Sequence, residues 1–148
     1  MAIRLLLFDT SILIPMIREK TYEDLFQRAL QAGRARLSSV VMQELYAGTR
    51  TPSDKKNYDR LNRTFLSQGH MIVPNHDDWI LSGILLAQYQ QRYGAVEPQD
   101  HINDILIALS AVRASATLVT ENTIDMERWQ KMLRRSGKLL NILAPRKP

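Results

Sequence analysis

The sequence predicts an α/β fold built on a mainly parallel sheet. Short apolar runs alternate with longer amphipathic stretches along the 148 residues, which is the pattern of strand–helix–strand units. A chain of this length buries roughly two thirds of the surface that it exposes when unfolded, so it needs no disulfide bonds, and it contains no cysteine. We therefore expect one domain over residues 1–148, with a short basic tail at residues 144–148.

The N-terminal part of the chain predicts two strands and a helix. Residues 5–8 are four consecutive apolar side chains, which suit a strand buried on both faces. Thr21, with an acidic residue three positions later, is the expected cap of a helix that ends near Gly33. Residues 36–38 follow as a second short strand.

The middle of the chain predicts three helices, because apolar side chains repeat there at spacings of three and four and a glycine closes each stretch. Ser39 and Asp77 are the expected caps of the first and third of these helices, and Pro52 is expected to open the second. The closing glycines are Gly48, Gly69 and Gly94, in chain order. A strand at residues 71–74 separates the last two helices.

The C-terminal part continues the alternation of helix and strand. A helix over residues 102–114 leads into the strand TLVT at residues 117–120. A last helix, with Trp129 on its apolar face, ends at Gly137 and precedes a final apolar run at residues 139–143.

Charge and hydropathy limit the possible partners. The net charge of +5 and the pI near 9.7 favour a polyanion. Each lysine or arginine alone suits a solvated surface, and together they suit contacts with a phosphate backbone. No apolar run approaches the ~20 residues that span a bilayer, and the N-terminal stretch is a poor signal peptide. We expect a cytoplasmic protein with no membrane partner.

Three acidic residues lie beside apolar sequence, where a charge is costly. Asp9 follows the first predicted strand, and sites in parallel sheets form outside the carboxyl ends of strands; it could equally cap the next helix. Glu44 shares a helix face with two valines, although its head could reach water or an arginine. Asp104 lines up with Ala108, where a small side chain lets the helix approach the sheet, but an acid also suits a first helical turn.

Further polar residues follow the strand predicted at residues 117–120. Thr120, Glu121, Asn122 and Asp125 could join the acids at this edge of the sheet, although Asn122 and Asp125 are also ordinary turn or cap residues. Asp100 is expected on a surface loop.

Converging carboxylates would need a cation between them. Two charges ~4 Å apart repel by ~4 kcal/mol at an effective dielectric constant of 20. With no cysteine and three scattered histidines, the ligands would be oxygen atoms, which favours Mg²⁺ or Mn²⁺ over Zn²⁺. Such an ion commonly engages phosphates, so the acids predict a phosphodiesterase acting on nucleic acid.

Four segments carry a family resemblance. FDTSILI, VVMQELYAG, NDILIALSA and LVTENTIDM, at residues 8–14, 40–48, 103–111 and 118–126, resemble in order and spacing the PIN-domain ribonucleases. The likeness extends over residues 3–143 and is greatest to the VapC-type toxins of bacterial toxin–antitoxin pairs. It implies a three-layer α/β/α sandwich and Mg²⁺- or Mn²⁺-dependent endoribonuclease activity.

The resemblance also implies roles for individual residues. Asp9, Glu44 and Asp104 match the family's acids, which implies catalytic and metal-binding roles for them. Thr10, Ser11, Thr120 and Asn122 would support the site by hydrogen bonds. Some family members carry an aspartate at the position of Asn122, and Asp125 matches an acid three residues further on. Asn122 or Asp125 would position water or substrate, and one metal or two stays open.

The partners implied by the likeness are RNA as substrate, a small antitoxin and a second copy of the chain. Alternatives from other classes are weaker. A haloacid-dehalogenase-type phosphatase needs an acid two residues after Asp9, where Ser11 stands, and a Rossmann domain needs a G-x-G-x-x-G motif that is missing here. A catalytically inactive PIN-like module that binds RNA or protein stays open, although retention of the acids counts against it.

Overall fold

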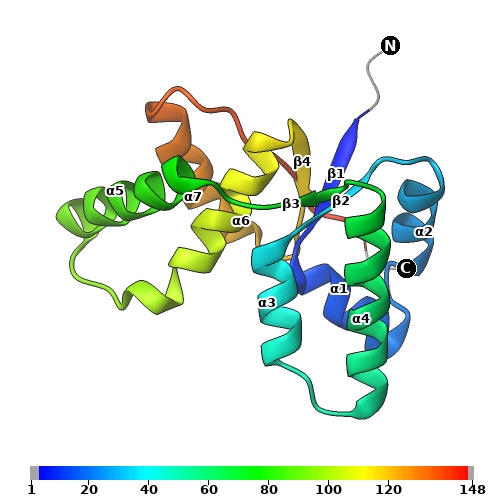
Figure 1. Ribbon diagram of the computed structural model, residues 1–148. Helices are drawn as coiled ribbons and strands as arrows, with labels where there is room; N and C mark the ends of the chain where they lie inside the picture. The colour runs from blue at the N-terminus through cyan, green and yellow to red at the C-terminus, as the bar shows by residue number, and fades with distance from the viewer. Residues whose placement is uncertain (1–3, 147–148) are drawn as a thin grey trace.

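The computed structural model describes residues 4–146 and contains one parallel sheet, with its strands in the order β3-β2-β1-β4-β5 (Figure 1). The strands are β1 Leu5–Phe8, β2 Ala35–Ser38, β3 Met71–Ile72, β4 Ala116–Val119 and β5 Asn141–Leu143. All four pairings are parallel, so the carboxyl ends of the strands lie at one edge of the sheet. The predicted α/β fold with a parallel sheet is confirmed.

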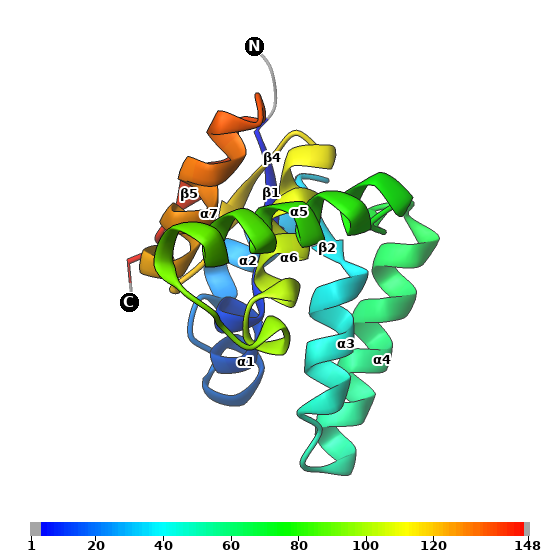
Figure 2. The same ribbon diagram turned by 90° about the vertical axis from the view of Figure 1, so that its left-hand side faces the viewer.

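Helices cover both faces of this sheet. They are α1 Thr10–Glu19, α2 Glu23–Gln31, α3 Ser39–Ala47, α4 Pro52–Ser67, α5 His76–Tyr93, α6 Ile102–Arg113 and α7 Thr123–Arg135, with a short 3₁₀ turn at Pro98–Asp100. Right-handed crossovers place α1 to α4 on one face and α5 to α7 on the other, which gives three layers (Figure 1). Figure 2 shows α3 and α4 side by side, extending away from the sheet.

The core is densest around the two central strands. Leu7 and Phe8 of β1 are completely buried, as is expected for a strand with helices on both faces. On one face the Phe8 ring lies 5.1 Å from that of Phe26 on α2, which in turn lies 6.1 Å from Phe65 on α4. On the other face Trp129 of α7 is fully buried. Burial of each such side chain contributes roughly 1.5–3 kcal/mol, which fixes β1 at the centre of the sheet.

Two of the predicted helix caps are wrong by one or two residues. Ser38, not Ser39, caps α3, because its Oγ accepts a hydrogen bond from the Val40 N–H. Asn75, not Asp77, caps α5, and it forms a reciprocal capping box with Asp78 that satisfies two backbone N–H groups.

The third predicted cap, Thr21, is also wrong. The residue before α2 is Tyr22, which has a left-handed backbone with φ of 66° and forms no side-chain cap. Its side chain is buried, and its hydroxyl donates a hydrogen bond to the Glu121 carboxylate across the site. A long-range contact therefore replaces the local cap at this helix start.

Strand boundaries differ slightly from the predicted ones. The strand predicted at residues 117–120 begins and ends one residue earlier, so Thr120 is the first residue beyond β4. No helix of the described residues could cross a bilayer. The single domain and the tail at residues 144–148 stay predictions, since residues 1–3 and 147–148 lie outside the part of the chain that the structure describes.

Candidate active site

The site begins where the two central strands end. β1 and β4 are neighbours in the sheet, and beyond them the Asp9 N–H donates to the Val119 carbonyl at 3.0 Å. This bond extends the pairing by one residue. Asp9 therefore lies next to Thr120 at the carboxyl edge of the sheet.

Two hydroxyl groups hold the Asp9 carboxylate. Oδ2 accepts hydrogen bonds from Ser11 Oγ at 2.8 Å and Thr120 Oγ1 at 2.7 Å. Each hydroxyl has a single proton, so the 3.3 Å approach between Ser11 and Thr120 is a contact rather than a further bond. Asp9 precedes α1 but does not cap it with its side chain, so the simple capping role is excluded.

The second oxygen of Asp9 has a different environment. Oδ1 makes no hydrogen bond within residues 4–146, although the residue as a whole is only 4% exposed. It is also not among the fully enclosed polar atoms that lack a partner, so it borders open space. Oδ1 is therefore the Asp9 atom available to a ligand.

Glu44 on α3 is tied to two other helices. Thr10 Oγ1 at the start of α1 donates to Glu44 Oε1 at 2.6 Å, and Asn103 Nδ2 on α6 lies 3.5 Å from Oε2. No lysine or arginine of the described residues forms an ion pair with it. The half-buried carboxylate of Glu44 thus faces the site and not a compensating cation.

Asp104 lies in the first turn of α6, and its carboxylate forms no hydrogen bond or ion pair with any described residue. Its burial, and after it the charges of Asp9, Glu44 and Asp125, together raise its pKa to about 7. The four acids are therefore close enough to act on one another. An ionised Asp104 needs a positive charge beside it.

The loop after β4 supplies the remaining predicted residues. Asp125 in the first turn of α7 lies 3.7 Å from Arg128, so it is partly neutralised. Asn122 occupies the position before α7, and its side chain forms no cap. Its backbone N–H donates to Thr120 Oγ1 at 2.9 Å, which helps to orient that hydroxyl. Asp100 is exposed on the 3₁₀ turn, as expected for a surface loop.

Sequence reasoning missed two residues of this region. Asn103 contacts Glu44, and its place directly before Asp104 in a polar first turn was an available signal. Tyr22 bonds to Glu121, and burial, followed by that hydrogen bond, raises the tyrosine pKa to about 12. No local pattern marks Tyr22, because its partner is distant in the sequence.

The donor set suits a hard divalent cation. The acids and their neighbours offer carboxylate and hydroxyl oxygens, which are the ligands of Mg²⁺ and Mn²⁺. Within residues 4–146 no three Asp, Glu or His side chains are spaced as a complete metal-binding group. Mg²⁺ is commonly held by one or two carboxylates with water, so the residues fit such an ion without a full protein cage.

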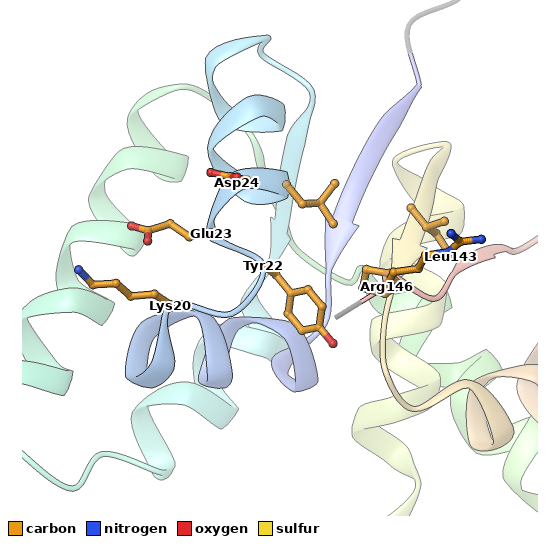
Figure 3. Close-up of a pocket in the computed structure, with 8 residues that line it drawn as sticks. Lys20, Tyr22, Glu23, Asp24, Leu143 and Arg146 are labelled. Carbon is orange, nitrogen blue, oxygen red and sulfur yellow. The ribbon is translucent and has the colours of Figure 1, made fainter. Parts of the chain in front are cut away.

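A cavity of about 500 Å³ lies beside the site rather than in it (Figure 3). Lys20 and Tyr22 line one side, and Leu143 and Arg146 line the other. None of the predicted acids lines it. Tyr22 connects the two regions through its bond to Glu121.

Comparison with known proteins identifies similar folds. The family model for the PIN domain matches residues 6–131. DNA-bound VapBC from Salmonella typhimurium is 20% identical with a TM-score of 0.65, and the match covers 95% of this chain and 98% of that chain. VapBC2 from Rickettsia felis, bound to a DNA fragment from its promoter, is 24% identical with a TM-score of 0.64 and coverage of 95% and 99%.

A third solved structure is equally similar. FitAcB from Neisseria gonorrhoeae is 17% identical with a TM-score of 0.66, and the match covers 95% of this chain and 98% of that chain. At these identities the solved structures share the fold. No curated protein sequence matches the chain.

Proposed function

This chain belongs to the PIN domain family, and on that premise we propose that it is a Mg²⁺- or Mn²⁺-dependent endoribonuclease, the toxin of a toxin–antitoxin pair. The observation that carries the proposal is the arrangement of acids after β1 and on α3 and α6. Asp9, Glu44 and Asp104 have no lysine or arginine ion-pair partner among the described residues. Such a group is costly unless it binds a cation.

The proposed metal ligands are Asp9, Asp104 and Glu44, and they would hold the ion partly through water molecules, because the three side chains are not spaced as a complete metal-binding group. When bound, the ion would polarise the phosphodiester and make water a better nucleophile. Ser11 and Thr120 would keep Asp9 in one orientation through their bonds to Oδ2.

Other residues of the site would hold and orient the reacting groups. Thr10 would fix Glu44 by its 2.6 Å hydrogen bond, so that this carboxylate faces the substrate in one rotamer. Asp125 and Asn122, at the start of α7, would position water or the RNA strand. Asn122 is neutral, so the proposal requires only one bound ion.

The proposed partners follow from the same family. The four motifs resemble those of VapC-type toxins, and the fold matches the VapBC and FitAcB structures. We therefore expect a small antitoxin that covers the acidic site and a second copy of the chain. The RNA substrate would place its action in the cytoplasm.

The test is RNA cleavage by the purified chain, which must be free of antitoxin and shown to be folded by its circular dichroism spectrum. Wild-type protein should cut structured RNA with Mg²⁺ or Mn²⁺, and cutting should stop with a chelator and in Asp104→Asn. Asp100→Asn is the matched control, since that acid is nearby and exposed, and it should leave cutting unchanged. Cutting that survives both the chelator and Asp104→Asn would refute the assignment. RNA binding without cutting would instead favour the inactive PIN-like module.

A further inference from the structure

A second hollow, outside the group of acids, is lined by the C-terminal part of α5 and by α7. Both helices lie on the same side of the sheet (Figures 1 and 2). The hollow has a volume of about 360 Å³. Three of its lining residues are cations of α7, Arg128, Lys131 and Arg135, at spacings of three and four. They therefore share one face of the helix over ~10 Å, which is longer than a single phosphate group. We call this hollow the α5–α7 groove.

The groove has an excess of positive charge. Glu127 is the one acid among its lining residues, so three cations against one acid leave a net charge of +2. Lys131 and Arg135 are exposed, and neither forms an ion pair with a described residue. Arg135 in the last turn also suits the helix dipole, but that explanation does not extend to Lys131 in the middle of α7. Unpaired cations on one face suit a polyanion.

Aromatic side chains form the other wall. Tyr93, the last residue of α5, is 61% exposed, and its ring lies 4.9 Å from the buried ring of Tyr89. Tyr89 is itself packed 5.2 Å from Trp129 and carries the Arg128 guanidinium 5.3 Å above its ring. Tyr93 is thus an exposed ring on a buried aromatic base, with the Arg92 guanidinium 6.0 Å from its ring centroid. Cations together with an exposed aromatic face are the elements with which proteins bind single-stranded nucleic acid.

The groove adjoins the proposed catalytic site. Arg128 lines the groove and lies 3.7 Å from Asp125, whose charge also acts on Asp104. A strand with a phosphate at the acids would therefore place its neighbouring nucleotides beside α7. We propose that the α5–α7 groove binds a single-stranded RNA segment adjacent to the cleaved bond, with Lys131 and Arg135 on phosphates and Tyr93 stacked on a base. This inference rests on the proposed nuclease function.

Single-stranded RNA fits better than the other polyanions. The bases of an RNA duplex are stacked on one another and cannot reach the Tyr93 ring. An acidic peptide would engage the cations but leave the exposed ring without a flat partner. Both become competing probes in the experiment.

The experiment measures binding separately from cleavage, by fluorescence anisotropy of a labelled oligouridylate of ~10 nucleotides in EDTA over a salt series. The variant Lys131→Gln with Arg135→Gln should bind ~10-fold more weakly than the wild type. Its affinity should also depend less on salt: the negative slope of log affinity against log salt concentration should be smaller in magnitude by ~1.4. The control Lys56→Gln with Arg60→Gln removes the same two residue types at the same spacing from exposed positions on α4, and it should change affinity by less than about twofold.

Tyrosine variants test the stacking contact. Tyr93→Leu should weaken binding ~10-fold and Tyr93→Phe by less than about twofold, because phenylalanine keeps the ring. All changed side chains are exposed, so the melting temperatures should match that of the wild type, and each is checked.

The outcomes separate this inference from the proposed function. Equal loss in both charge variants, no loss in either, or tighter binding of an RNA duplex or a polyglutamate peptide would overturn the groove assignment. If the double variant at Lys131 and Arg135 binds and cuts RNA normally, the groove assignment is overturned while the proposed nuclease function is supported. Binding that depends on the groove in a protein that never cuts RNA would support the groove and refute the nuclease.

Discussion

Replacing Asp104 by asparagine should stabilise the metal-free protein while it abolishes RNA cleavage. Burial, and then Asp9, Glu44 and Asp125, raise the pKa of Asp104 from 3.8 to about 7. The folded protein therefore holds this proton more tightly than the unfolded chain does. Stability is highest where Asp104 is protonated in both states, and it falls as the pH rises from about 4 to about 7. Asparagine avoids the cost because it carries no charge.

The size of the effect follows from the pKa. A rise of ~3 units corresponds to a ceiling of ~4 kcal/mol, because each unit is worth ~1.4 kcal/mol. Asp104 is only partly buried, so solvent screens much of this, and we expect a gain of ~1–2 kcal/mol. The Asp104 carboxylate makes no hydrogen bond with a described residue, so the change to asparagine breaks none. In a chain of this length the melting temperature should rise by roughly 2 to 8 °C.

The assay is thermal unfolding in EDTA, followed by circular dichroism. Asp104→Asn should melt above wild type at about pH 8, and the difference should shrink as the pH falls and vanish at about pH 3, where the wild-type carboxyl is protonated in both the folded and the unfolded state. Asp100→Asn, an exposed neighbour, controls for loss of one negative charge and should show no such difference. If Asp104→Asn does not raise the melting temperature at about pH 8, or raises it equally at both pH values, our account of the acids is wrong.

Three other outcomes are expected. Mg²⁺ should raise the melting temperature of the wild type more than that of the Asp104→Asn variant, because an ion that binds only the folded state stabilises it. Thr10→Val should lower cleavage ~10-fold by freeing Glu44, and Thr10→Ser should restore it. Arg113→Gln should destabilise by ~1–3 kcal/mol without changing the RNA cleavage rate of folded protein, because it breaks the bond to Asp78. Burial raises the Asp78 pKa, but Arg113 and the hydrogen bond from the Asn75 N–H hold it below its ordinary value. The stability that the bond between Arg113 and Asp78 contributes should therefore be lost as the pH falls below about 4, as measured in urea titrations.

The acids were predictable because a charge beside apolar sequence is visible locally. Asp9 follows four apolar residues, and the parallel sheet then places it next to the residue after β4. The contacts that orient the acids were not visible in this way. Thr10 and Glu44 are 34 residues apart, and Ser11 and Thr120 are 109 apart. Sequence spacings of two, three and four indicate which residues are neighbours on the same strand or helix. They do not indicate which residues of different elements are in contact.

Boundaries of the elements failed for other reasons. α1 was not predicted as a separate helix, and it contains Pro15, which is unfavourable in a helix interior. β3 pairs through only two residues at the sheet edge, and Pro74 has no N–H to continue the pairing expected at residues 71–74. Adjacent serines at 38 and 39 are equivalent as letters, and only the path of the backbone decides which of them reaches the amide of the next turn.

The two hydroxyls on Asp9 Oδ2 bear on the choice among alkaline-earth ions. A carboxylate whose Oδ2 already accepts two hydrogen bonds has one oxygen, Oδ1, left to coordinate, so it favours monodentate ligation. Calcium draws much of its binding from carboxylates that contribute both oxygens and from a large, adaptable coordination sphere, whereas magnesium takes single oxygens in an octahedron. The serine and threonine that steady Asp9 thereby deny calcium a bidentate carboxylate at this position and leave the single oxygen that suits magnesium.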